Sequence, residues 1–73
     1  MTKINSNVNG VLEHIQRNED GTFKIKILGD DGDFHIYSKL TSVHKKSEYE
    51  VGDCIGEAND LYYAVKKQLS KVY

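Results

Sequence analysis

The sequence predicts a small all-β domain, a barrel or barrel-sandwich hybrid of about six short strands. Three observations carry this prediction. Apolar and polar residues alternate with a period of two along several segments, acidic glycine-containing turns separate those segments, and β-branched and aromatic residues are concentrated within them. A chain of 73 residues has room for one hydrophobic core, so we expect residues 1–73 to form a single domain.

The N-terminal part of the chain predicts a loose start followed by a strand. Residues 1–8 are mostly polar, so we expect them to form a loose N-terminus. Residues 11–17 fit helical spacing as well as strand alternation. We favour a strand, because this short segment lies between an Asn-Gly turn signal and an Asp-Gly turn signal.

The next two predicted strands have the most regular pattern. Residues 22–28 alternate cleanly, so Phe23, Ile25 and Ile27 share one face, which we expect to be buried. Residues 34–40 alternate as well, and we expect their first, third, fifth and seventh positions to face the core. The outward-facing set would then be His35, Tyr37 and Lys39.

The second half of the chain is less regular. Residues 41–50 are polar, and Val43 and Tyr49 are the expected inward anchors. Residues 51–53 form a predicted turn, and residues 54–55 a short buried strand.

The C-terminal part of the sequence is compatible with either a strand or a helix. Residues 57–60 are expected to connect the short strand to a last one, because the aromatic and β-branched side chains of residues 61–66 favour strand. The apolar residues of this region also fit helical spacing, namely Leu61, Val65, Leu69 and Val72. Residues 67–73 stay an uncertain tail.

Charge and apolar content limit the classes of function. Ten lysine and arginine residues stand against eleven aspartates and glutamates, for a formal net charge of −1. This balance argues against a generic binder of nucleic acid or anionic membranes, whose affinity comes mainly from phosphate neutralisation. The chain starts without the pattern of a signal peptide, and no apolar run approaches the ~20 residues of a membrane span. We expect a cytoplasmic location.

Residues 25–40 are a predicted strand, glycine turn and strand that ends in Tyr37-Ser38-Lys39-Leu40. With this pattern the central stretch resembles the LytM-type zinc endopeptidases of the M23 family. Residues 25–40 match a strand, glycine turn and strand that ends in Tyr-x-His-Leu in the family. Residues 46–56 are similar to its turn in which Val-x-x-Gly leads into Ile-Gly, and residues 61–65 to its closing strand. The resemblance covers about residues 9–66 and implies a barrel-sandwich hybrid fold.

The catalytic residues of that family do not carry over to this chain. Its Tyr-x-His-Leu histidine falls on Lys39, and its closing His-x-His pair falls on Asp60 and Tyr62. Its upstream metal ligands would precede Asn9, where only polar and aliphatic residues stand. A catalytic zinc needs three protein ligands and an open position. We therefore expect no metal, no cofactor and no enzymatic activity.

The other candidate chemistry has simpler explanations. The three histidines, His14, His35 and His44, are scattered, so we expect solvated side chains rather than a metal site. The aspartates of residues 30–33 lack the register of a calcium loop and fit a hairpin turn. Cys54, the single cysteine, is expected to be a small buried apolar residue.

The predicted role is binding, through a surface of lysine and tyrosine side chains. The candidate residues are Lys24, Lys26, Tyr37, Lys39 and Tyr62. The M23 resemblance implies a non-catalytic protein-binding or structural module, part of a phage tail or virion assembly or a regulator of cell-wall hydrolases. Its partner would be a protein or a second copy, and its location the cytoplasm or a phage particle. The alternative is a small OB- or SH3-like barrel that binds single-stranded nucleic acid.

Overall fold

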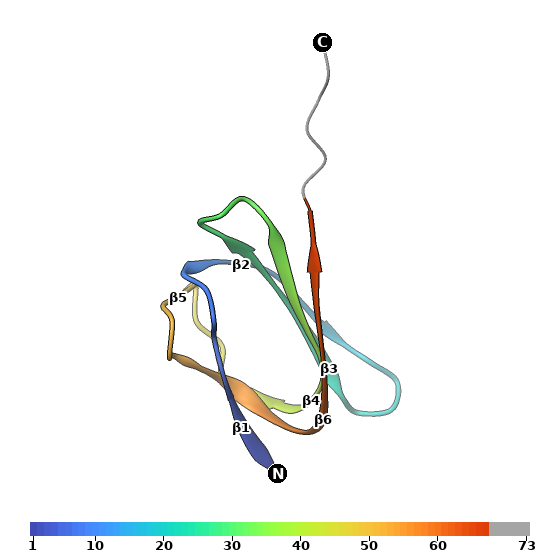
Figure 1. Ribbon diagram of the computed structural model, residues 1–73. Coiled ribbons are helices and arrows are strands. Elements are labelled where there is room, and N and C mark those ends of the chain that lie inside the picture. Colours follow the sequence, from blue (N-terminus) through green and yellow to red (C-terminus); the bar gives the residue numbers. More distant parts are fainter. Residues whose placement is uncertain (68–73) are drawn as a thin grey trace.

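The computed structural model describes residues 1–67 as one antiparallel sheet of six strands (Figure 1). This confirms the all-β, barrel-like prediction. The described residues contain no helix, and therefore none long and apolar enough to cross a membrane. The strands are β1 (Thr2–Asn5), β2 (Gly10–Arg17), β3 (Phe23–Gly29), β4 (Phe34–Val43), β5 (Glu48–Tyr49) and β6 (Cys54–Lys66).

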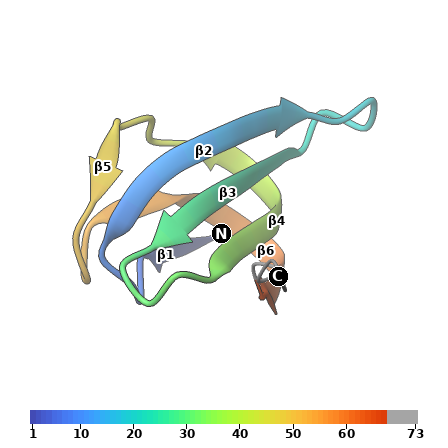
Figure 2. The same cartoon turned by 90° about the horizontal axis from the view of Figure 1, so that it is seen from above.

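The sheet is strongly curled, with the strand order β1-β6-β4-β3-β2-β5 (Figure 2). Backbone hydrogen bonds tie its two ends together. Beyond β1, the Ser6 amide donates to the Asp53 carbonyl at 2.7 Å, and the Gly52 amide donates to the Ser6 carbonyl at 2.8 Å. These bonds join the segment after β1 to the turn between β5 and β6, so the curled sheet is held in a barrel-like shape.

The hydrophobic core lies on the inner side of the curl. On β3, Ile25 and Ile27 are fully buried, as their alternation predicted. The expected anchors Val43 and Tyr49 are confirmed as well, since Tyr49 is buried and Val43 packs against the core. The buried hydrophobic residues are Val8, Ile25, Ile27, Tyr37, Leu40, Tyr49, Ile55 and Ala58.

The predicted orientation of β4 is wrong for residues 34–38. His35 and Tyr37 are buried, while Phe34 and Ile36 lie on the opposite face. The cause is Lys39, whose φ of 63° is left-handed and which sits at an irregularity in the pairing with β6. The extra residue breaks the period of two, so both Tyr37 and Leu40 point inward. Sequence alternation alone does not reveal such a bulge.

Residues 1–8 are not the loose terminus that we expected. Thr2–Asn5 forms β1, which pairs with the first part of β6. This pairing uses backbone groups, so it needs few apolar side chains, and Ile4 is the one that packs against the core. Ser6 and Val8 are buried directly after it.

The two ambiguous segments both form strands. Gly10–Arg17 is β2, as favoured from its flanking turns. Residues 61–66 are strand and not helix, but they belong to a 13-residue strand that also includes residues 57–60, which we expected to be a connection. Leu69 and Val72, which suggested the helix, lie outside the described residues.

Gly56 provides a test of how closely the strands approach. A Cβ at this position would lie 2.0 Å from the Ser42 carbonyl oxygen on β4. We expect Gly56→Ala to lower the free energy of unfolding by about 3 kcal/mol, because backbone atoms would have to shift. Urea unfolding followed by circular dichroism measures this change.

Gly52→Ala is the matched control. Its Cβ would meet no atom within 4 Å, but its φ of +95° is left-handed. We expect a smaller loss, about 1 to 2 kcal/mol. Equal losses for the two variants would contradict the close approach of β4 and β6 at Gly56.

Candidate functional site

The outer surface of the sheet combines lysine and apolar side chains. Cross-strand pairing places Lys26 between His14 and Ile36, and Leu28 between Val11 and Phe34. Since partners in an antiparallel pair share a face, these side chains form continuous rows across β2, β3, β4 and β6. We call this surface the lysine–aromatic face. It comprises Val11, His14, Lys24, Lys26, Leu28, Phe34, Ile36, Tyr62, Ala64 and Lys66.

The apolar members of this face are not part of the hydrophobic core. Leu28, Phe34 and Ile36 are half-buried and lie on the other side of the sheet from the buried Ile25 and Ile27. Val11, the cross-strand partner of Leu28, and Tyr62, the partner of Ser38, are more open, with 48% and 60% of their surface exposed. Glu48, the cross-strand partner of Val11 on β5, adds one carboxylate at the edge of these rows, against three lysines within the face. The result is an apolar and basic surface.

One contact on the face links its two kinds of side chain. The Lys26 ammonium lies 4.3 Å from the centroid of the Phe34 ring. A cation over an aromatic face is favourable by about 0.5–1 kcal/mol at an exposed site. Lys26 therefore covers part of the ring that Phe34 would otherwise offer to a ligand.

The structure brings three of the five candidate surface residues together. Lys24, Lys26 and Tyr62 lie on the lysine–aromatic face, and Lys39 is exposed at the bulge of β4. Tyr37 is only 2% exposed and belongs to the core, so its assignment to the surface is wrong. Sequence reasoning also missed Phe34 and Ile36, which the inverted orientation of β4 moves outward.

His35 forms the centre of a partly buried polar chain. Its Nε2 lies 3.0 Å from Asp31 Oδ2, and its Nδ1 lies 2.7 Å from the hydroxyl of Tyr63. His35 is 6% exposed, so the expectation of a solvated side chain is wrong for this histidine. His14 and His44 are exposed, as expected. The chain of contacts joins the β3–β4 turn to β6.

Tyr37 extends this polar region to the N-terminal segment. Its hydroxyl donates to the side-chain oxygen of Asn7 and accepts from the Asn7 amide at 3.3 Å. Its ring lies against that of Tyr63, with centroids 4.9 Å apart. Burial raises the pKa of Tyr37, because the charged phenolate would lose its water. These neutral, paired groups hold the segment after β1 against the barrel, which is a structural role.

The acidic residues 30–33 form a hairpin turn, as predicted. Gly32 has a φ of 85°, and the Asp33 amide donates to the Asp31 carboxylate at 3.0 Å. This hydrogen bond, followed by the one from His35, lowers the pKa of Asp31 below its usual value. Within residues 1–67, no group of three or more His, Cys, Asp or Glu side chains is placed to hold a metal ion.

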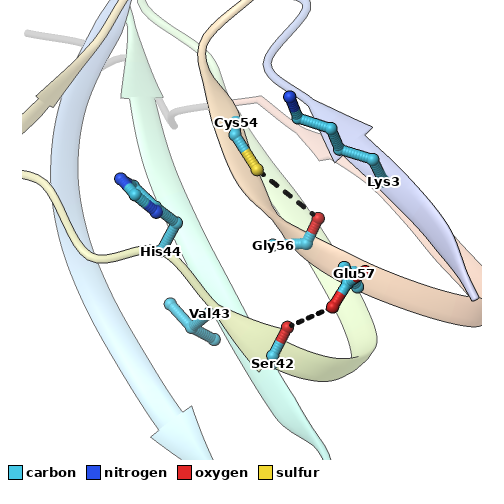
Figure 3. A pocket seen from close by; sticks show the side chains of 7 residues that line it. All are labelled: Lys3, Ser42, Val43, His44, Cys54, Gly56 and Glu57. Atoms are coloured by element: carbon cyan, nitrogen blue, oxygen red, sulfur yellow. Dashed lines mark hydrogen bonds between the residues drawn. The ribbon is translucent and has the colours of Figure 1, made fainter.

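A shallow pocket lies where β1, β4 and β6 meet (Figure 3). Its volume is about 290 Å³. Sequence reasoning missed it, because its residues come from three distant segments. The lining residues are Lys3, Ser42, Val43, His44, Cys54, Gly56 and Glu57.

Two pairs of polar groups in the pocket bond to each other. The Cys54 thiol lies 3.8 Å from the Gly56 carbonyl, and the Ser42 hydroxyl lies 3.4 Å from the Glu57 carboxylate. Cys54 is half-buried rather than buried, which corrects its expected place in the core. The pocket thus lies at the junction of β1, β4 and β6, and its lining includes a basic residue, Lys3, and an acidic one, Glu57.

No family model, no curated protein and no solved structure matches this chain. The resemblance to M23 peptidases therefore stays a hypothesis from the motifs. The three positions that would hold the family's histidines, Lys39, Asp60 and Tyr62, are all exposed on β4 and β6.

The Asp31 contacts predict a pH-dependent contribution to stability. A carboxylate whose pKa is lowered on folding stabilises the protein above its unfolded value of 3.8 and loses that effect as the pH falls through the folded value. We expect Asp31→Ala to lower the urea midpoint at neutral pH. The difference from the wild type should shrink as the pH falls below about 4.

Asp30→Ala is the control for this measurement. Asp30 is exposed in the same turn, and its carboxylate accepts no hydrogen bond from a residue of the described range 1–67. Its midpoint should follow the wild type at every pH. A gap between Asp31→Ala and the wild type that is the same at acidic and neutral pH would contradict the role of the ionised carboxylate.

Proposed function

We propose that this chain is a non-catalytic binding module whose partner is a protein that docks on the lysine–aromatic face. The observation that carries the proposal is the outward row of Phe34, Ile36 and Leu28 beside open Val11 and Tyr62. Contiguous exposed apolar surface of this kind is typical of interaction sites. Aromatic side chains at its centre and polar ones around it are the usual arrangement of protein interfaces.

The charge of the face specifies the chemistry of the partner. Lys24, Lys26 and Lys66 lie among the apolar side chains, whereas Glu48 lies at the β5 end of the rows, beyond Val11. Complementary potential steers association and rejects partners of like charge. The partner surface should therefore be apolar at its centre and carry aspartate or glutamate around it.

The non-catalytic part of the proposal rests on the M23 resemblance. A domain of that family that has lost its metal ligands would keep its surface for binding, with Lys39, Asp60 and Tyr62 where histidines stand in the peptidases. The same resemblance suggests part of a phage tail or virion, or a regulator of cell-wall hydrolases, as the context. Binding in the cytoplasm or within a particle would suit either role.

Binding of single-stranded nucleic acid is the second candidate. It is favoured by the exposed ring of Tyr62 near several lysines on one face, since bases stack on aromatic rings in a basic groove. Two features make it the weaker candidate. Phe34 is partly covered by the Lys26 ammonium, and the aliphatic side chains of Leu28 and Ile36 provide no flat ring for stacking.

A charge placed at the centre of the face tests the proposed function. The full chain and its Ile36→Glu variant are used to capture proteins from the extract of the native source. The wild type should retain one protein in stoichiometric amount, and Ile36→Glu should reduce its recovery at least about tenfold, because a carboxylate opposite Lys26 interrupts the apolar centre and repels an acidic partner.

Val51→Glu is the matched control for the capture experiment. Val51 is 62% exposed in the turn between β5 and β6, away from the lysine–aromatic face. This variant should recover the partner as the wild type does. Equal recovery with Ile36→Glu would disprove the face as the docking site.

An oligothymidylate of about twenty nucleotides distinguishes the second candidate. Titration at low and moderate salt should show negligible binding if the partner is a protein. Tight binding that weakens steeply with salt, and that Lys24→Glu abolishes, would replace the protein partner with single-stranded nucleic acid.

A further inference from the structure

The end of β6 is a sheet edge with no neighbouring strand among the described residues. On one side, β4 pairs with β6 up to Lys66. On the other side, β1 pairs only with Cys54 to Ala58. On that side, the backbone groups of residues 61–66 have no strand partner among residues 1–67 (Figure 1). We call residues 61–66 the free edge.

The free edge lacks the usual protection against pairing with another chain. Natural edges are short, bent, or protected by proline and by charged side chains, lysine above all. The other edge strand, β5, has only two residues. The free edge has no proline, its first charged residue is Lys66, and it exposes Tyr62 and Val65 by 60% and 46%. An unprotected apolar edge is a template for strand addition.

We propose that the free edge pairs antiparallel with the free edge of a second copy of this chain, about a two-fold axis through Ala64. A two-fold axis normal to the sheet sets outward side chains of one copy opposite outward side chains of the other. With Ala64 opposite Ala64, Tyr62 faces Lys66 of the second copy and Tyr63 faces its Val65.

The side chains of the free edge complement themselves in this register. Tyr62 opposite Lys66 sets an aromatic ring beside an ammonium group, and Tyr63 opposite Val65 sets an aromatic ring beside a β-branched one. No like charges are directly opposed. The pairing lies beyond Ala58, which is opposite the first residue of β1, Thr2, so the β1–β6 ladder does not overlap it.

The pairing would double the lysine–aromatic face. Both copies turn the same side of the sheet outward, so the two faces form one continuous surface across the dimer. A partner with two acidic segments would bind the dimer more tightly than it binds one copy, because both segments can be engaged together. The dimer does not depend on the proposed protein partner, and either could fail without the other.

Sedimentation equilibrium of the full chain between about 10 µM and 1 mM tests the dimer. The strand pair is short, so we expect weak, concentration-dependent dimerisation, with slower amide hydrogen exchange in residues 61–66 as the concentration rises. Tyr62→Lys should raise the dissociation constant of the dimer at least about tenfold. In each copy the introduced lysine would face Lys66 of the other copy, so the dimer would contain two pairs of like charges. A chain that stays monomeric at 1 mM would disprove the inference.

Two further variants test the register and the surface. Adding Lys66→Glu to Tyr62→Lys should restore the dimer, since each introduced lysine then faces a glutamate of the other copy. Val11→Lys, on β2 and away from the free edge, should leave dimerisation unchanged. Loss of the dimer in Val11→Lys with persistence in Tyr62→Lys would move the contact to another surface and overturn the proposal. Ile36→Glu should keep the dimer, which separates it from partner binding.

Discussion

The left-handed conformation of Lys39 is the constraint on which the arrangement of this barrel depends. A side chain at a φ of 63° costs about 1 kcal/mol, and this cost lets one residue pass without continuing the alternation of β4. Leu40 and Tyr37 then both point into the core, although three positions separate them. The part of β4 before Lys39 is therefore turned over relative to a regular strand.

This inversion makes the interior partly polar and explains two segments that look like loose loops in the sequence. Once His35 and Tyr37 face inward, their polar atoms need partners. The β3–β4 turn supplies Asp31 to His35, and the segment after β1 supplies Asn7 to Tyr37. Among the described residues, no buried side-chain nitrogen or oxygen lacks a hydrogen bond. Both polar segments thus stabilise the fold.

The orientation of a strand could be predicted from the sequence only where its two faces differ clearly in polarity. On β3, lysine on one side and isoleucine on the other allow a single orientation, and the prediction is confirmed. On β4, Phe34 and Ile36 alternate with His35 and Tyr37, so both faces have large side chains and either can fill the core. The bulge that decides between them has no signature in the alternation. β1 is held by backbone pairing, which a hydrophobic pattern does not report.

The bulge at Lys39 also determines which side chains of β4 lie on the lysine–aromatic face. Lys24, Lys26 and Tyr62 could be assigned to a surface from the sequence, whereas Phe34 and Ile36 could not, because alternation alone places them in the core. With a regular β4, tyrosine would lie beside the lysines, as in a barrel that stacks bases. The inverted strand places aliphatic and aromatic side chains there instead, and one ring is already covered by Lys26. An apolar surface among lysines favours an acidic protein over a nucleic acid, so the choice between the two functions depends on the backbone of one residue.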